Sequence, residues 1–453
     1  MELLVEQIQL DNKNAESKFL NQVFDDLFPL CRSITGIGLE SSLEYLKKLM
    51  PLEIEKISSG TKVFDWVVPP SWIFKRARLW GPDGRLICDT NVSNLHVMNY
   101  SEPVDKEVSY SELKKHLFSI PHLPDAIPYV TSYYKRDWGF CLPHHERINL
   151  PEGKYKVLIN SQFDNEGGVP FGQCVLKGDS KREILLTSYL CHPSLANNEL
   201  SGPLVLLGLY NRIKKWPKRR FSYRFLLNPE TIGSLCFLHK HYEHLKANLE
   251  AGLILTCLGG PKETLRYKAS KCKTSLFDKL LNTQPENWHQ IPFTPLSGSD
   301  ERQYCAPGFN LPMGQVSRTS YGQYDGYHNS LDDKKFMDIN SILSSIDEIE
   351  KLIFEAEYSG RVLNLCPYGE PQLGKRNLYP NINSPTNKNK SSDDVLDCRE
   401  ELNTILTILS EADGTKYMTD IASEMGHPLA KLIPVIDKLE KQKLIAFNTG
   451  ITL

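Results

Sequence analysis

The sequence lacks long hydrophobic runs, an excess of charge of either sign, and regularly spaced cysteines. No stretch approaches the roughly 18 uninterrupted apolar residues that a transmembrane helix needs. The formal net charge is -2, so no overall field would draw the chain to nucleic acid or to an anionic membrane. With 453 residues, of which 40% are hydrophobic, the chain is too apolar for disorder and is expected to form about two to four domains.

Several specific signatures are also missing. The 11 cysteines are odd in number and never spaced Cys-x-x-Cys, so we expect reduced thiols packed as small hydrophobic side chains. Glu2 and Glu6 stand where a signal peptide would carry Lys or Arg, which is typical of a cytoplasmic protein. The motifs G-x-x-x-x-G-K-[ST] and G-x-S-x-G are both absent, so a P-loop or a serine-hydrolase site has no support.

What is present predicts an α/β core with a mostly parallel sheet sandwiched by helices. Apolar runs typical of buried strands alternate with helical segments at 201–216 and 233–248. An amphipathic pattern over 336–356 predicts the helix that closes this core. The expected strands of the sheet lie at 155–160, 172–176, 184–189, 223–227 and 253–257.

Changes in composition divide the chain around this core, which we assign to 1–61 and 129–363. Residues 62–128 consist of short β-type runs punctuated by Pro and Gly, and are expected to form a small inserted β-rich domain. Four prolines and an Asn/Lys/Ser run indicate an extended linker over 364–396. Three helical patterns followed by a short apolar run predict a C-terminal winged helix-turn-helix over 397–453.

The charge of the C-terminal segment bears on its partners. Residues 397–453 include six Lys or Arg and nine Asp or Glu. This balance opposes the counterion release that drives DNA binding. We therefore expect no nucleic-acid or membrane partner, and we expect the winged helix or the inserted domain to contact a protein partner or a second copy of the chain.

Histidines and carboxylates follow several predicted strands, where an open α/β sheet binds its ligands. His192 follows the strand at 184–189, Glu199 begins the next helix, and Glu230 follows the strand at 223–227. Imidazole nitrogens and carboxylate oxygens around one open position are the ligands of catalytic zinc. Taken together, these residues predict a metal site at one edge of the sheet.

Each candidate also has an ordinary structural interpretation. Glu199 by itself fits a carboxylate paired with a helix dipole, and Asp332 fits a cap for the helix that follows it. The tract from His239 to His244 looks like a run of metal ligands, but its Lys and Glu neighbours favour a solvated helix face. Only the joint occurrence and the order of the candidates favour a metal site.

That order resembles a known family. His…(Asn/Asp)-x-x-Ser-Gly…Glu-x-x-Gly…Ser-Asp…Tyr-His-x-x-x-Asp is similar to the pattern of zinc-dependent aminopeptidases with co-catalytic metals, a family that includes the glutaminyl cyclases. More narrowly, the chain resembles a bacterial branch with an aminopeptidase-like core, a small inserted β domain and a C-terminal winged helix. The motifs that carry this resemblance lie at 133–141, 191–193, 229–233 and 298–302. The resemblance covers nearly the whole chain and implies a phosphorylase/hydrolase-like zinc peptidase core.

The resemblance also implies roles for matching positions. His192 matches the first metal ligand, Glu230 the catalytic general base and His328 the last ligand, and Asp332 matches the carboxylate that follows it. Three positions where the family carries carboxylates hold amide or hydroxyl side chains in this chain, namely Asn198, Thr231 and Thr256. Because such groups are weak zinc ligands and carry no charge, one zinc ion is favoured over two.

We therefore predict a single zinc ion on His192, Glu199 and His328, with Asp300 as an added ligand or as a partner of the ligands. Glu230 would take a proton from water that attacks an amide carbonyl. The predicted function is a metal-dependent hydrolase of the aminopeptidase type, acting on a small peptide or acyl-amine substrate. A catalytically decayed, ligand-binding regulatory protein that acts through the winged helix, with no metal bound, stays open.

Four further side chains lie near the motifs. Arg302, Arg318 and Tyr324 could meet a substrate carboxylate, and each could equally form an internal salt bridge or be a buried hydroxyl. Asn198 is a further candidate for a contact with the substrate or with the metal ligands.

Overall fold

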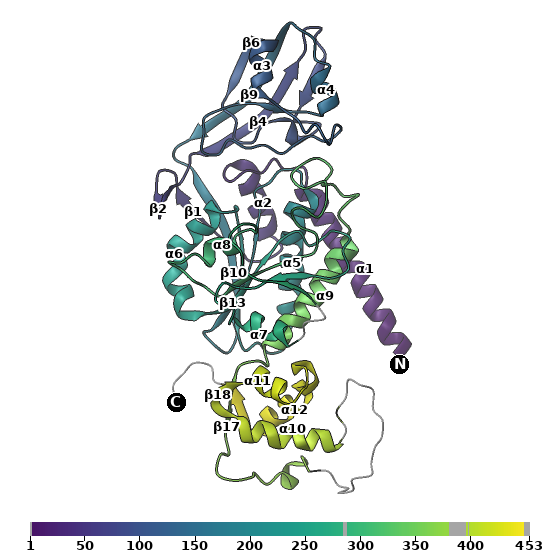
Figure 1. Cartoon of the computed structure of the whole chain (residues 1–453), viewed down its shortest axis with the longest axis vertical. Helices are drawn as coiled ribbons and strands as arrows, with labels where there is room; N and C mark the ends of the chain where they lie inside the picture. The colour runs from purple at the N-terminus through teal and green to yellow at the C-terminus, as the bar shows by residue number, and fades with distance from the viewer. Residues whose placement is uncertain (1, 284–287, 380–395, 397, 448–453) are drawn as a thin grey trace.

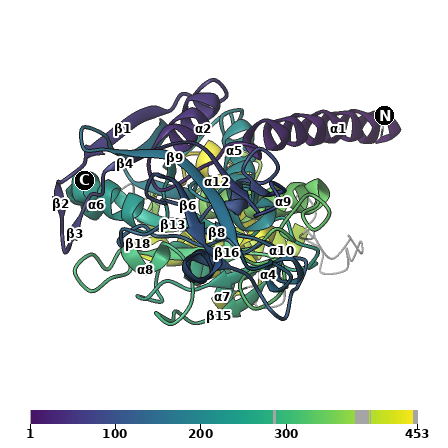
Figure 2. The ribbon, with the colours of Figure 1, turned by 90° about the horizontal axis from the view of Figure 1, so that it is seen from above.

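The computed structural model describes residues 2–283, 288–379, 396 and 398–447. Figure 1 shows three parts along the long axis: a small sheet at one end, an α/β core in the middle and a winged helix at the other end. The N-terminal helix α1 (Glu2–Leu27) extends outward from the core, which is clearest in Figure 2. In the described part of the chain, no helix is long and apolar enough to cross a membrane.

Within the described residues, the core contains an eight-stranded sheet with parallel strands at its centre. The strand order is β1-β10-β12-β11-β13-β16-β14-β15. Strands β12, β11, β13 and β16 run parallel to one another, and antiparallel pairs lie towards the edges. The predicted mostly parallel α/β sheet is confirmed. Its strands are β1 (Glu53–Ser58), β10 (Gly168–Leu176), β11 (Glu183–Tyr189), β12 (Ser222–Asn228), β13 (Leu249–Leu255), β14 (Arg266–Lys268), β15 (His289–Ile291) and β16 (Met313–Ser317).

Helices cover both faces of this sheet. Along β11, Ile184 and Leu186 join one apolar core, whereas Leu185 between them joins the other. Burial on both faces explains why this strand is a continuous apolar run in the sequence. The first core is covered by α1, α2 (Ile37–Lys47), α5 (Ser201–Ile213), α7 (Leu276–Asn282) and α9 (Ile339–Ala356), and the second by α6 (Ile232–Asn248) and α8 (Glu301–Tyr304).

The small sheet has the strand order β5-β4-β9-β6 and corrects one prediction. We expected 155–160 in the main sheet, but β9 (Lys154–Asp164) pairs with β4 (Ser71–Trp80) and β6 (Val104–Ser109), and β5 (Leu86–Asp89) completes this sheet. Buried Tyr155 alternates with exposed Lys154 and Lys156, which is the pattern of a strand with one solvated face. The small sheet therefore uses a strand from beyond the 62–128 range expected for the inserted domain.

The remaining elements up to residue 376 are short. They are β2 (Lys62–Val63), β3 (Trp66–Val67), β7 (Leu117–Phe118), β8 (Phe140–Cys141), α3 (Tyr110–Leu113), α4 (His144–Ile148) and the 3-10 turns η1 (Asn94–His96), η2 (Lys114–His116) and η4 (Gly374–Arg376). The ten cysteines whose side chains are described are free thiols, as expected, and most are buried.

The C-terminal part is a winged helix, as predicted. Its three-stranded sheet has the order β18-β17-β19, and its elements are β17 (Arg361–Asn364), α10 (Cys398–Glu411), β18 (Asp413–Tyr417), α11 (Met418–Glu424), α12 (Leu429–Lys441) and β19 (Ile445–Phe447). Residues 361–363, which we assigned to the core, instead pair with strands of the winged helix. Residues 380–395 of the expected linker, with its Asn/Lys/Ser run, lie outside the described residues.

Candidate active site

The candidate residues lie where the central strands end. Tyr189 at the end of β11 is in register with Asn228 at the end of β12, so the loops that carry His192 and Glu230 begin side by side. The loop that precedes α9 brings His328 to the same place, with its ring centre 5.2 Å from that of His192. The predicted convergence of the two imidazoles is therefore observed.

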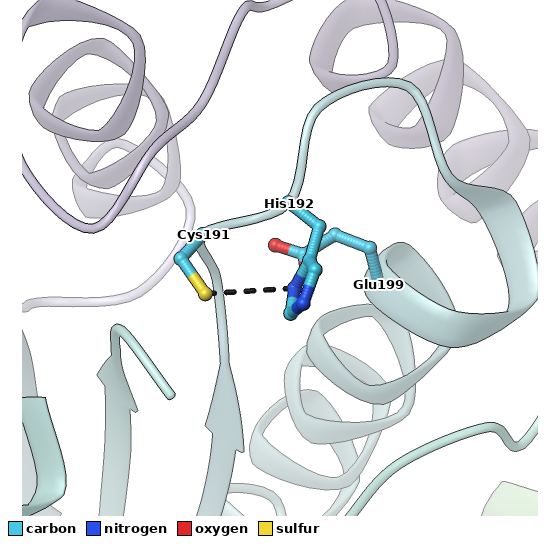
Figure 3. A group of neighbouring side chains, drawn as sticks. All are labelled: Cys191, His192 and Glu199. Carbon is cyan, nitrogen blue, oxygen red and sulfur yellow. Dashed lines mark hydrogen bonds and ion pairs between the residues drawn. The ribbon is translucent and has the colours of Figure 1, made fainter. Parts of the chain in front are cut away.

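One nitrogen of His192 is held from behind by a carboxylate. Glu199 lies in the π-helical turn η3 (Ala196–Leu200), is fully buried, and accepts a hydrogen bond of 2.7 Å from His192 Nδ1. Figure 3 shows this pair together with Cys191. The other oxygen of Glu199 lies 3.6 Å from Nε of the buried Arg32, which also donates to the His192 carbonyl. A carboxylate on Nδ1 fixes the tautomer and orientation of the ring, as is usual for metal-binding histidines.

The Nε2 atoms of His192 and His328 have different surroundings. His192 Nε2 lies 3.8 Å from Glu230 Oε2, which is too far for a hydrogen bond. His328 Nε2 is buried and has no hydrogen-bond partner in the described part of the chain. The ring of Tyr129 contacts both imidazoles edge-on. Its centre lies 5.0 Å from the ring centre of His192 and 5.4 Å from that of His328. A buried imidazole nitrogen without a partner is costly, unless a ligand satisfies it.

The two imidazoles differ in the direction of their pKa shifts. Burial lowers the pKa of His192, but its interactions with Cys191 and Glu199 outweigh burial and raise this pKa above its usual value. Burial and the neighbouring charge of His192 lower the pKa of His328 to about 3. The Glu199 carboxylate, which raises the pKa of His192, would equally favour a metal cation there, with release of the proton.

A rigid loop orients Glu230. Ser299 Oγ donates to Glu230 Oε1 at 2.7 Å, and the Ser299 backbone N–H donates to Glu301 at 2.9 Å. Glu301 in turn pairs with the buried Lys268 at 2.7 Å. Gly298 has φ 136°, and a Cβ at this position would lie 1.9 Å from the Glu301 carboxylate, so the turn requires glycine.

Asp300 supports the same loop from below. It accepts a 2.7 Å hydrogen bond from the backbone N–H of Thr231, a residue with the strained φ of 61°. Burial, with a smaller contribution from Glu230, raises the pKa of Asp300 to about 7. The ion pairs of His192 are with Glu199 and Glu230, and Asp300 joins neither imidazole among the residues described. Of the two roles predicted for Asp300, this placement favours a partner of the ligands over an added metal ligand.

Asp332 is a cap, but not of the helix that we expected. Its carboxylate accepts the backbone N–H groups of Asn197 and Asn198, at 2.7 and 2.8 Å, in the turn that precedes α5. The helix that follows it, α9, is capped by Asp338 instead. Tyr324 donates to Asp332 at 3.1 Å, so its hydroxyl is engaged inside the protein.

Two of the three positions that lack carboxylates, Asn198 and Thr256, join a neutral network. The Asn198 amide donates to the Tyr189 hydroxyl at 3.0 Å, and that hydroxyl lies 2.7 Å from Thr256 Oγ1. Uncharged groups joined in this way would not hold a second dication.

The two arginine candidates have protein partners. Arg318 is buried and donates to the carbonyl of Glu263 and to the carboxylate of Glu348 on α9, so it is an internal anchor. Arg302 Nε donates to the Ser299 carbonyl within its own loop. Of the two interpretations that we left open, the structure favours the internal one for Arg318.

The donor types suit one divalent cation. His192 Nε2 lies 3.8 Å from the Glu230 carboxylate, and the His192 ring centre lies 5.2 Å from that of His328. Histidine nitrogen with carboxylate oxygen is a zinc donor set. Among the described residues, one group has candidate ligand atoms that all lie within 4.8 Å of one another, and it consists of Cys191, His192 and Glu199 without His328. Burial raises the pKa of Cys191 to about 11, so its thiol stays protonated and is a weak ligand.

Comparison with known proteins agrees with this architecture. Residues 21–359 match the family described as a domain of unknown function, DUF4910. The chain belongs to this family. Residues 361–447 separately match a winged helix-turn-helix family.

Relatives of this DUF4910 protein cover almost its whole length. A Clostridium acetobutylicum protein, named provisionally as a polysaccharide biosynthesis protein with an aminopeptidase-like domain, is 38% identical over 439 residues, which are 96% of this chain and 98% of that protein. A crystal structure from Clostridium acetobutylicum, described provisionally as a peptidase, has a TM-score of 0.83 at 35% identity and covers 98% of this chain and 100% of its own.

A zinc aminopeptidase from Bacillus subtilis shares the fold at 11% identity, with a TM-score of 0.54, over 75% of this chain and 94% of its own. The resemblance inferred from the motifs, an aminopeptidase-like core followed by a winged helix, is confirmed.

Sequence reasoning missed three residues of the DUF4910 core that shape this site. Arg32, Tyr129 and Ser299 contact Glu199, the two imidazoles and Glu230, respectively. Ser299 lies within the motif at 298–302 that we had singled out, so its position was a usable signal. Arg32 and Tyr129 come from segments far from the other candidates in the chain, and nothing local in the sequence indicates their partners.

Proposed function

We propose that this protein is a metal-dependent hydrolase of the aminopeptidase type, which cleaves an amide bond near a free amine or a related small acyl-amine bond. One observation carries the proposal: the imidazoles of His192 and His328 converge with ring centres 5.2 Å apart, His192 Nε2 lies 3.8 Å from Glu230, and the buried Nε2 of His328 has no hydrogen-bond partner among the described residues. The shared fold with a zinc aminopeptidase supports it.

His192 and His328 would hold a single zinc ion in this proposal. Glu199 would act mainly through His192 Nδ1, where it already accepts a short hydrogen bond, rather than as the direct ligand that we first predicted. A bound zinc ion supplies Lewis acidity, which lowers the pKa of water beside it and polarises the substrate carbonyl.

Glu230 is the proposed general base. Ser299 holds one of its oxygens, and the other oxygen faces His192 Nε2. A carboxylate fixed in this way can take a proton from the attacking water and return it to the departing amine. The strained Thr231 and the buried Asp300 hold the loop in which Glu230 lies.

The charges near Glu199 favour one ion over two. The buried guanidinium of Arg32 already supplies a positive charge 3.6 Å from the second oxygen of Glu199. A second dication at that oxygen would meet this fixed charge and the neutral network of Asn198, Tyr189 and Thr256.

The test replaces Glu230 by Gln and uses the exposed Glu243→Gln as a matched control. Wild type and variants would be assayed with zinc, cobalt or manganese on aminoacyl-arylamides, short peptides and N-acyl amino sugars, the last because a relative is named for polysaccharide biosynthesis. We expect Glu230→Gln to lower kcat/KM by about 10²–10⁴-fold with its metal content unchanged, and Glu243→Gln to match wild type. Full activity of Glu230→Gln would remove Glu230 from the mechanism.

A ligand-binding regulator that acts through the winged helix is the second candidate. The neutral side chains at Asn198 and Thr256, where the resembling family carries carboxylates, favour it. It predicts ligand binding without stoichiometric metal and without turnover of any substrate in the panel. Turnover that Glu230→Gln abolishes would exclude it.

A further inference from the structure

A small cavity beside Glu230 has two basic residues in its wall. Its volume is about 90 Å³, far below the roughly 300–1,000 Å³ of sites for drug-sized ligands. It therefore fits one short side chain or substituent of a substrate. Polar groups from the loop at 297–299, from β16 and from the loop at 320–321 form much of the remaining wall.

The first basic residue, Lys268, is fully engaged. Its ammonium donates to the Thr294 carbonyl at 2.6 Å, to the Ser297 carbonyl and to Glu301 at 2.7 Å. Since an ammonium group has three N–H donors, none is left for a ligand. The carboxylate of Glu301 also balances its charge, so Lys268 braces the loop that positions Glu230.

The second basic residue, Arg266, has far fewer protein partners than Lys268. It lies at the start of β14, and its side chain makes one hydrogen bond, 3.3 Å from Ser320 Oγ, within the residues that the structure describes. It forms no ion pair with a carboxylate in that part of the chain. A half-buried guanidinium with unused N–H donors is suited to bind a carboxylate through two parallel hydrogen bonds.

We propose that Arg266 selects substrates whose group next to the scissile amide carries a carboxylate. This inference rests on the proposed hydrolase, because the proposed general base Glu230 lines the same cavity. The hydroxyls of Ser297 and Ser299 and the amide of Gln315 are neutral wall groups that also suit a polar substituent. The carboxylate could belong to an acidic amino acid or to a uronic acid, and these two sources are separated below.

Binding is measured first, because it does not depend on turnover. Calorimetric titration of the full chain would compare L-glutamate with L-glutamine, and D-glucuronate with D-glucose. In wild type, we expect at least one acid to bind about tenfold or more tightly than its neutral counterpart, and the pair that shows this preference identifies the source. Equal affinity within both pairs would overturn the inference.

Substitution of Arg266 then tests whether this residue causes the preference for acids over their neutral counterparts. Arg266→Met should bring the affinity ratio close to one, Arg266→Lys should keep part of it, and the exposed Arg85→Met on the small sheet should keep all of it. If Arg266→Met fails to fold, as judged by circular dichroism, Arg266→Lys and Arg266→Gln provide the same comparison. A preference that survives every change at Arg266 would overturn the inference.

Hydrolysis separates this inference from the function on which it rests. With aminoacyl-arylamides, Glu and Asp derivatives should exceed Gln and Asn derivatives in kcat/KM by about tenfold, and Arg266→Glu should reverse the preference towards Lys derivatives. If acids bind through Arg266 but nothing is hydrolysed, the hydrolase fails and the cavity assignment stands. Hydrolysis with a preference for neutral derivatives keeps the hydrolase and contradicts the role of Arg266.

Discussion

Two regions of this molecule combine histidines with carboxylates, and they use them differently. On α6, His241 Nε2 lies 3.2 Å from Glu55, and His244 Nε2 lies 3.0 Å from Glu183. Glu183 also forms a two-bond pair with Arg224, at 3.0 Å for each bond. These imidazoles belong to a network in which each nearby carboxylate already has a cationic or hydrogen-bonding partner.

At the carboxyl edge of the sheet, by contrast, the Nε2 atoms of the histidines are not hydrogen-bonded to any carboxylate that the structure describes. Glu199 binds His192 through Nδ1, so Nε2 is left on the side of Glu230, and His328 Nε2 has no partner among the described residues. The tract on α6 looks more like a metal site in the sequence, because its histidines are neighbours. We therefore expect metal ligands at this edge of the sheet rather than on α6, where His241 and His244 are already paired.

The largest expected difference is in zinc content. Alanine in place of His192 or His328 should abolish stoichiometric zinc binding, because each change removes one of only two available imidazoles. His241→Ala and His244→Ala should bind zinc like wild type. Equilibrium dialysis followed by elemental analysis measures this. Zinc lost equally from the α6 variants would show that the two regions do not differ as the geometry indicates.

A large effect on stability is expected on the α6 side. Glu183→Gln leaves the buried Arg224 without its carboxylate and should lower the free energy of unfolding by about 3–5 kcal/mol. Its zinc affinity should stay unchanged. Urea denaturation measures the stability, with the exposed Glu243→Gln as the control that stays near wild type. A stable Glu183→Gln protein would mean that this network is not structural.

A smaller effect is expected where a carboxylate acts through a histidine. Glu199→Gln keeps an acceptor for His192 Nδ1 but removes the negative charge, and should weaken zinc binding by about 10–100-fold. Glu55→Gln makes the corresponding change beside His241 and should have no effect on zinc. Competition with a chelator of known affinity measures both variants, and equal affinities would place Glu199 outside the metal site.

The last expected effect is a change in the pH dependence of stability. Burial raises the pKa of Asp300 to about 7 from 3.8, so the folded protein binds this proton more tightly than the unfolded chain does. The resulting stabilisation is complete below about pH 4 and is lost as the pH rises through about 7. Asp300→Asn should remove this fall in a plot of Tm against pH, whereas the exposed Asp65→Asn should keep it. Parallel curves for all three proteins would contradict the assignment.

Several features of the fold could be read from local patterns. The run at 184–189 is apolar on both faces and became the central strand β11, and the amphipathic segment at 336–356 became α9. The strand at 155–160 was assigned to the wrong sheet, although its alternation of Lys with Tyr and Val already indicated one solvated face. Patterns specify which faces of a strand are buried, but they do not name the neighbouring strand.

The candidate site likewise has features that the sequence predicted and features that only the structure revealed. The order of motifs pointed to His192, Glu230 and His328, and the structure brings them together. It also moved Asp300 and Asp332 into supporting and capping roles, because each meets backbone N–H groups of a distant loop. Such pairings depend on where loops meet at the sheet edge, which no local pattern encodes.

By itself, the sequence determined the secondary structure of the core, the likeness to aminopeptidases and the absence of most carboxylates for a second metal ion, because these depend on residue type, order and periodicity. Only the tertiary structure decided that Arg32 lies beside Glu199, that the α6 histidines are already paired, and that Arg266 faces a cavity without a carboxylate partner in the described residues. Hydrogen bonding and burial decide whether a side chain is available to a ligand, and both are set by contacts between residues far apart in the chain.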